Sequence, residues 1–321
     1  KIPGGFPVVE ESTLKLDLYR RDFTINTMAV ALNPQRFGEL IDFFGAQRDI
    51  KEKRIRVLHS LSFVEDPSRI LRAVRFEKRY GFTLGKQTLS LVHSAVNAGF
   101  LRGIPGKRIF HEIRQILSEE DPVACMERLK ELGVLEAIHP ALIFNPQAAE
   151  GFQKAKQTIS WFNLLYTHET IRPWFIYLLA LTDQMKPKTI IAIAESLGFS
   201  GADAREILAS KHTVLEIFRR FNTERENTPA WMVGVLENAS LEEILFAMSK
   251  TSSADMQEMI STYITTWRHY KPPVAGKDLI AIGFSQDKYL GACLKTIRDK
   301  GLNGEIKDYS EAMALARTML P

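Results

Sequence analysis

The apolar residues of this 321-residue chain recur mainly at helical spacing, and segments that alternate like strands are short. Between residues 141 and 270, apolar positions three and four apart predict seven helices. They lie near residues 147–166, 170–184, 187–198, 201–220, 228–237, 240–249 and 252–269. Further helices are predicted at 86–100, from 104 onward, at 121–132, at 286–300 and at the C-terminal end. The pattern therefore predicts a mainly α protein.

The first 58 residues combine helix with short strands. Strands are predicted at 39–43 and 54–58, with a short polar helix at 46–53 between them. A helix over residues 22–32 is predicted before them, and on it Asp22 and Asn26 would lie four residues apart on one face. The same helix should place its apolar residues in the core: Ile25, Met28, Ala29 and Leu32. The polar pair is then either a cap with a surface hydrogen bond or part of a pocket.

The most informative element is a predicted helix from Asp66 to Gly81. Asp66 followed by Pro67 marks its start, because Asp accepts hydrogen bonds from free amides and Pro tolerates the first helical position. One face is apolar, with Ile70, Leu71 and Val74. Another face is cationic, with Arg72, Arg75 and Arg79, and with Arg69 at its edge.

Two interpretations of this cationic face are open. It is either a solvated basic surface or an anion site, since guanidinium groups at fixed spacing suit phosphate oxygens. In the second case Asp66 and Arg69 also offer an acceptor and donors that match the edge of a base. Spacing alone does not decide between the two.

Composition is that of a globular protein with a core large enough for two or more subdomains, since 45% of the residues are hydrophobic and 25% charged. The formal net charge of +4 is only weak evidence for a polyanionic partner. Cys125 and Cys293 are too few and too far apart for a zinc cluster or a disulfide framework, which favours a reducing cytoplasm. No apolar run approaches membrane-spanning length, and the scattered histidines predict no metal site in this chain.

Three motifs in order resemble the class II tRNA nucleotidyltransferase and poly(A) polymerase family, which comprises CCA-adding, CC-adding and A-adding enzymes. They are RRDFTINTMA at residues 20–29, IDFFGAQRDI at 41–50 followed by RIRV, and EDPSRILRAVRFEKRY at 65–80. Thr27 stands where the family usually has alanine. The resemblance is dense from Glu11 to about Pro140 and returns near the C-terminus.

The resemblance implies a helical neck, body and tail preceded by a small α/β remnant of the nucleotidyltransferase head. The head remnant would comprise residues 1–58, the neck with its nucleotide-reading helices 59–140, the helical body 141–270, and the tRNA-binding tail 271–321.

The resemblance also implies roles for individual residues. Asp22 and Asn26 would line the nucleotide pocket, and Arg21 would contact the triphosphate. Selection of the nucleotide would come from Asp66 and Arg69 at the base edge. Two further arginines would hold phosphates: Arg72 and Arg75.

Two basic residues are predicted as RNA contacts, Arg108 and Lys277. Arg108 lies in a predicted first turn, where a cation opposes the helix dipole and so serves a partner or an ion pair, for which Glu112 is a candidate. The family has a comparable neck helix that braces the pocket. Lys277 opens a helix whose amides would suit a phosphate, unless this start is only a capped turn.

The family's metal-binding carboxylates lie upstream of its first motif, and no such arrangement occurs in this chain. We therefore expect the nucleotide-selecting and tRNA-binding part of a template-independent nucleotidyltransferase that adds CMP and/or AMP to tRNA 3′ ends. Its substrate would be ATP and/or CTP, its Mg²⁺ would be held mainly by a missing N-terminal half, and this chain alone would be inactive. The alternatives are a non-catalytic helical RNA-binding module and a helical scaffold. The motifs leave CCA, CC and A addition open.

Overall fold

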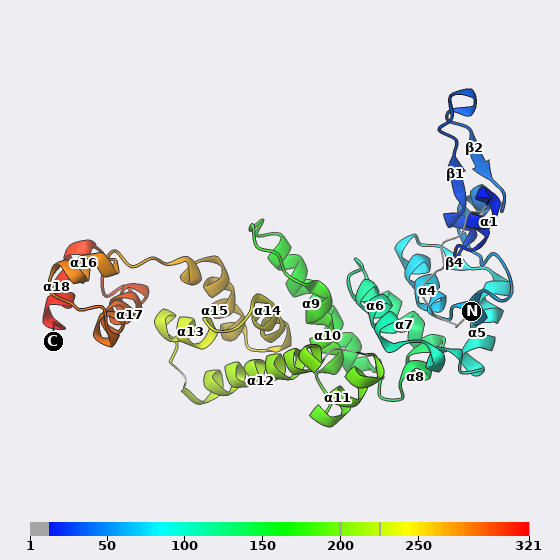
Figure 1. Cartoon of the computed structure of the whole chain (residues 1–321). Helices are drawn as coiled ribbons and strands as arrows, with labels where there is room; N and C mark the ends of the chain where they lie inside the picture. Colours follow the sequence, from blue (N-terminus) through cyan, green and yellow to red (C-terminus); the bar gives the residue numbers. More distant parts are fainter. Residues whose placement is uncertain (1–12, 199–200, 225, 321) are drawn as a thin grey trace. The chain divides into compact units, whose positions relative to one another are not determined.

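The computed structural model describes residues 13–198, 201–224 and 226–320 (Figure 1). Helices dominate these residues, which confirms the mainly α prediction. None of the helices in the described ranges is long and apolar enough to cross a membrane. Contacts divide the chain into two compact units, and the boundaries between them fall in α9 (Pro146–Asn163), before Arg172, and in α12 (Gly201–Glu224). The four segments predicted from the sequence are not tested by this division and stay a prediction.

The first unit contains the described residues up to Gln153 together with Arg172–Leu208. It begins with α1 (Leu14–Tyr19), the 3-10 helix η1 (Thr24–Asn26) and strand β1 (Met28–Val30). The 3-10 helix η2 (Pro34–Arg36) leads to β2 (Leu40–Asp42), which pairs antiparallel with β1. Helix α2 (Ala46–Lys51) and strand β3 (Arg54–Ile55) follow, and β3 pairs in parallel with β4 (Thr83–Leu84). The predicted strands and the polar helix are thus confirmed, with shorter bounds.

The predicted helix over residues 22–32 is wrong. The chain makes only the short η1 and then enters β1, and Leu32, expected in the core, is 74% exposed. Two local features oppose a helix here. The Asp22 carboxylate accepts the Phe23 N–H and the Asn26 side chain, which compete with helical hydrogen bonds. The Thr24 N–H donates to the Arg56 carbonyl at 2.9 Å, so the segment is held to the β3 region instead.

The remainder of the first unit is helical and packs around α4 (Arg69–Arg79), which lies against α6 (Gly106–Leu117) and α7 (Pro122–Glu131). The other elements are α3 (Ser62–Glu65), α5 (Lys86–Asn97), η3 (Phe100–Gly103), α8 (Val134–Ile138), α10 (Pro173–Thr182) and α11 (Pro187–Ser196). The predicted apolar stripe of α4 is confirmed, because Ile70, Leu71 and Val74 are fully buried.

Helix α4 begins three residues later than Asp66 because residues 62–65 form the separate turn α3, which Asp66 terminates. The Asp66 carboxylate still accepts the N–H and hydroxyl of Ser68, at 3.2 and 2.6 Å. Asp66 therefore lies in a tight turn between two helices, and its side chain is fixed before α4 starts.

The second unit contains Lys154–Ile171 and the described residues from Ala209 onward. After α12 come α13 (Pro229–Leu236), α14 (Leu241–Lys250), α15 (Ala254–Thr265) and η4 (Trp267–His269). The last helices are α16 (Gly276–Ala281), α17 (Lys288–Leu302) and α18 (Tyr309–Thr318). These three helices share a buried core made of Val274, Leu279, Phe284, Cys293, Ile297, Ile306, Ala312 and Ala316. The seven helices predicted from 141 to 270 are all present as α9–α15.

Candidate functional site

A polar pocket of about 390 Å³ opens in the first unit, between the segment before η1, the α3–α4 turn and helix α6. Eight residues line it: Arg21, Asp22, Asn26, Asp66, Arg69, Arg72, Arg108 and Glu112. The structure therefore brings together six of the seven residues predicted for nucleotide binding, and adds Arg108 and Glu112 from α6. Four guanidinium groups against three carboxylates leave the lining positive, which suits an anionic ligand.

Asp22 organises one wall of the pocket. Its Oδ2 accepts hydrogen bonds from Nε of Arg72, at 2.8 Å, and from Nη2 of the same guanidinium, while its Oδ1 accepts from Asn26 at 2.8 Å. Burial of Asp22 opposes its ionisation, but the Asn26 hydrogen bond and the Arg72 charge outweigh this cost, and the pKa of Asp22 lies below its usual value. The bidentate pair fixes the plane of the Arg72 guanidinium.

Asp66 and Arg69 form a second wall. Arg108 Nη2 donates to Oδ2 of Asp66, and Arg69 Nε lies 3.9 Å from the same oxygen. Arg69 is itself fixed, because it donates to the Ser62 hydroxyl at 2.8 Å and to the Arg20 carbonyl at 3.0 Å. Only 12% of its side chain is exposed. An acceptor and a donor group are thus held side by side at the pocket, as the sequence predicted.

Arg75 shares a face of α4 with Arg72 and Arg79, as predicted, but its side chain is neither a solvated surface group nor part of the pocket lining. Arg75 is 7% exposed and lies between two carboxylates, 3.8 Å from Glu112 and 3.5 Å from Glu119. Arg79 also pairs with Glu119, at 2.8 Å. The pairing predicted between Arg108 and Glu112 is replaced by others, since Arg108 reaches Asp66 and Glu112 reaches Arg72 at 3.6 Å. The assignment of Arg75 to phosphate binding stays a prediction.

Sequence reasoning missed the roles of Glu112 and Glu119. A signal existed, because these carboxylates are seven residues apart, as are Arg72 and Arg79. Residues seven apart lie on one face of a helix, so the two carboxylates can meet the two arginines when these segments pack side by side. Arg75 Nε and Glu112 Oε2 are buried and have no hydrogen-bond partner among the described residues. The contact between Arg75 and Glu112, at 3.8 Å, is therefore an attraction between charges and not a hydrogen bond.

Arg21 is the most exposed cation of the pocket, with half of its side chain accessible, and its Nη2 lies 3.6 Å from Asp17. Lys277, predicted as an RNA contact, belongs to the second unit and is exposed on the short helix α16. The Asp278 carboxylate accepts the Ala275 N–H at 2.8 Å, so the helix start expected to attract phosphate carries an acidic cap. Lys277 itself remains accessible beside it.

The pocket residues do not fit a divalent-metal site. Each of the three lining carboxylates is engaged: Asp22 by Arg72 and Asn26, Asp66 by Ser68 and Arg108, and Glu112 by Arg72 and Arg75. In the described part of the chain, no three His, Cys, Asp or Glu side chains are grouped as metal ligands.

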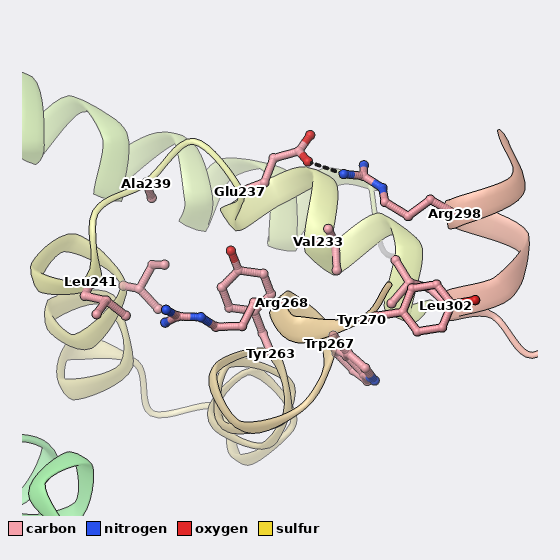
Figure 2. Close-up of a pocket in the computed structure, with 11 residues that line it drawn as sticks. Val233, Glu237, Ala239, Leu241, Tyr263, Trp267, Arg268, Tyr270, Arg298 and Leu302 are labelled. Carbon is pink, nitrogen blue, oxygen red and sulfur yellow. Dashed lines mark hydrogen bonds and ion pairs between the residues drawn. The ribbon is translucent and has the colours of Figure 1, made fainter. Parts of the chain in front are cut away.

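A second pocket, of about 350 Å³, lies within the second unit among α13, α14, α15, η4 and α17 (Figure 2). Arg298 donates to Glu237 at 2.9 Å, and Arg268 pairs with Glu169 outside the lining. Burial raises the pKa of Tyr263, which is one of the residues that line this pocket. Both arginines of this pocket are thus neutralised by carboxylates, in contrast to the positive lining of the first pocket. No pattern in the sequence predicted this second pocket.

Comparison with known proteins gives two family matches. Residues 6–56 match the poly A polymerase head domain, and residues 81–158 match a probable RNA and SrmB-binding site of polymerase A. The A-adding tRNA nucleotidyltransferase of Geobacter sulfurreducens is 39% identical over 322 residues, which cover 98% of this chain and 36% of that protein. The enzyme of the same name from Halalkalibacterium halodurans is 28% identical, over 98% of this chain and 70% of that protein. The chain thus spans little more than a third of the first of these relatives.

Solved structures match over nearly the whole chain. The CCA-adding enzyme of Thermotoga maritima complexed with tRNA-CCA is 30% identical, with a TM-score of 0.74 over 95% of this chain and 73% of that chain. A CCA-adding enzyme in complex with ATP is 30% identical, with a TM-score of 0.73 over 94% of this chain and 71% of that chain. A CTP complex gives the same TM-score of 0.73 at 30% identity, over 95% of this chain and 72% of that chain.

Proposed function

Because the chain belongs to the class II tRNA nucleotidyltransferase and poly(A) polymerase family, we propose that it is the nucleotide-selecting and tRNA-binding part of an enzyme that adds CMP and/or AMP to tRNA 3′ ends. One observation carries the proposal: a positive pocket combines an exposed arginine and buried, hydrogen-bonded arginines with an acceptor–donor pair. The similar structures that contain ATP, CTP and tRNA support these substrate classes. The A-adding relatives make ATP the first substrate to test.

In this proposal, the two walls of the pocket bind different parts of the nucleotide. Arg72, aligned by Asp22, and the exposed Arg21 bind phosphate oxygens, because guanidinium groups hold phosphate through paired hydrogen bonds. Asp66 and Arg69 hydrogen-bond to the base edge, so selection depends on side chains instead of a template. Arg75 does not line the pocket, and it acts indirectly through its contact with the lining residue Glu112.

The transfer step is assigned to residues outside this pocket. Divalent ions, when bound, activate the 3′ hydroxyl and stabilise the leaving pyrophosphate, and they need free carboxylates as ligands. Since the carboxylates of this pocket are paired with arginines, we place the metal ligands N-terminal to residue 1. The two cysteines, both free, favour a reducing cytoplasm as the location of the enzyme. This chain would position the nucleotide and hold the tRNA.

Arg72→Gln should weaken ATP binding to the 321-residue chain about tenfold, which corresponds to ~1.4 kcal/mol. Glutamine keeps a donor for Asp22 but removes the cation that would face the phosphates. Isothermal titration with ATP measures the effect. Arg79→Gln is the matched control, because Arg79 lies on the same helix and pairs with Glu119 outside the pocket lining. Equal losses in the two variants would mean that the effect is not local to the pocket.

Lys277→Ala should lower the slope of log K against log salt concentration for tRNA binding by about one unit, because one phosphate contact is lost. ATP affinity should stay unchanged, since Lys277 does not line the ATP pocket. Lys288→Ala removes another exposed charge, from α17, and is the control. An unchanged slope in Lys277→Ala would remove Lys277 from the RNA contacts.

A further inference from the structure

The second pocket is bounded on one side by helix α17, which contributes Arg298 and Leu302 to its lining. Two contacts hold α17 in this place. Arg298 donates to Glu237 at 2.9 Å. The Tyr270 ring packs against α17 at Gly301, where an added Cβ would lie only 2.0 Å from the tyrosine hydroxyl. The pocket is therefore shaped by close contacts between its walls.

One polar group of this pocket lacks a partner. Tyr263 is 7% exposed, and no described residue forms a hydrogen bond with its hydroxyl. Figure 2 shows this hydroxyl pointing among the other residues that line the pocket. A buried tyrosine hydroxyl normally finds a partner, because burial removes its hydrogen bonds with water. Since a hydroxyl both donates and accepts, the pocket offers a ligand both kinds of hydrogen bond at this point.

The charges around the second pocket cancel. Arg298 pairs with Glu237 within the lining, and Arg268 pairs with Glu169 just outside it. Two cations matched by two carboxylates leave no excess of positive charge that would attract a phosphate group. The second pocket therefore suits a neutral ligand, whereas the first pocket suits an anionic one.

The remaining lining suits a flat ligand with a polar edge. Trp267 and Tyr270 contribute aromatic rings, and aliphatic side chains from α13, α14 and α17 contribute further apolar surface. Arg298 uses Nη1 for Glu237 and Nε for Asp299, so its Nη2 still has hydrogens to donate. The volume of about 350 Å³ lies within the range of small-molecule sites, which combine apolar walls with a few polar groups.

We propose that the second pocket binds a nucleobase, with the faces of the base against apolar side chains and its edge hydrogen-bonded to Tyr263 and Arg298. A base is neutral and planar, carries donors and acceptors on its edge, and stacks on aromatic side chains. The choice of a base among such groups rests on the proposed function, because bases are the neutral planar groups of nucleotides and tRNA. The base belongs either to a free nucleoside or to bound RNA, and both sources offer the same chemistry.

The test titrates adenosine, guanosine, cytidine and uridine in turn into the full 321-residue chain, after ATP has filled the first pocket. At least one nucleoside should bind with a stoichiometry of one. Tyr263→Phe keeps the ring but removes the hydroxyl, so it should weaken this binding about fivefold, the effect of one hydrogen bond between neutral groups. Binding of no nucleoside would overturn the proposal and would mean that solvent alone satisfies the hydroxyl.

Tyr289→Phe is the matched control, because Tyr289 is 53% exposed on α17 and does not line the pocket. Ala239→Phe fills the pocket without removing a polar group. It should abolish nucleoside binding, which keeps the test decisive if Tyr263→Phe does not fold. Nucleoside affinity that is unchanged in both pocket variants would overturn the proposal.

ATP affinity, measured on the same proteins, separates this inference from the proposed function. Tyr263→Phe should leave ATP affinity unchanged, since Tyr263 does not line the first pocket. A chain that binds ATP but no nucleoside would overturn this inference alone. A chain that binds a nucleoside through Tyr263 but does not bind ATP would overturn the proposed function alone.

A tRNA that lacks its terminal adenosine distinguishes the two sources of the base. If the base belongs to RNA, this tRNA should displace the bound nucleoside, and Tyr263→Phe should weaken tRNA binding. If the ligand is a free nucleoside, the tRNA should bind while the nucleoside stays in place, and Tyr263→Phe should leave tRNA affinity unchanged.

Discussion

Incubated with Mg²⁺, ATP and a tRNA that lacks its terminal adenosine, the 321-residue chain should bind ATP and leave the tRNA unextended. The arginines of the pocket can neutralise a triphosphate, but charge neutralisation does not activate a terminal hydroxyl. That step needs free carboxylates, and those of this pocket are paired with arginines. Gel analysis of end-labelled tRNA measures single-nucleotide extension directly, and the expected difference between inactive and active forms is all or none.

A longer chain that also includes the residues N-terminal to residue 1 should extend the same tRNA, and Arg72→Gln should reduce that activity. Both forms can first be checked for ATP binding. A form that binds ATP but does not extend the tRNA is then folded and lacks the metal ligands, so a failure to fold does not explain its inactivity. Extension by the 321-residue chain alone would show that its metal ligands lie within it. Glu119, Glu120 and Asp121 would then be the first residues to replace, although Glu119 is already bound to Arg79.

The helices were predictable where burial alone sets the periodicity. The seven helices from α9 to α15 follow from apolar spacing, and so does the buried stripe of α4 with Ile70, Leu71 and Val74. Asp22 and Asn26 were also correctly predicted to interact, because the 2.8 Å hydrogen bond between their side chains spans only one turn of chain. The surrounding helix was nevertheless wrong, since the Thr24 N–H is bonded to Arg56, a partner far along the chain.

The charges of the site were predictable as a set but not as pairs. A helical projection places Arg72, Arg75 and Arg79 on one face. It does not show that Glu112 of α6 and Glu119, just after the end of α6, cover part of that face. The same limit applies to Arg108, whose partner Asp66 is 42 residues away. Long-range ion pairs depend on which helices pack together. Matching spacings show that two faces could pair, but periodicity in a single sequence does not show that these two helices are neighbours.

Arg75→Ala should lower the free energy of unfolding by about 3 kcal/mol, because it removes the one cation shared by two buried carboxylates, each of which is left with a single partly exposed arginine. Arg75 is 7% exposed and lies near two carboxylates that are themselves buried, Glu112 and Glu119. Arg79→Ala is the control, since 42% of the Arg79 side chain is exposed and its pair with Glu119 should contribute less than about 1 kcal/mol. Urea denaturation followed by circular dichroism measures both variants.

A comparison of Arg75→Ala with Arg72→Gln decides what Arg75 does for the nucleotide. If Arg75 acts only through its contacts with Glu112 and Glu119, then Arg75→Ala should reduce ATP affinity less than Arg72→Gln does. Both affinities are measured under conditions in which both variants remain folded. A loss of ATP affinity as large as that of Arg72→Gln, with little change in stability, would show that Arg75 reaches the phosphates directly. That result would require its side chain to leave Glu112 and Glu119 when the nucleotide binds.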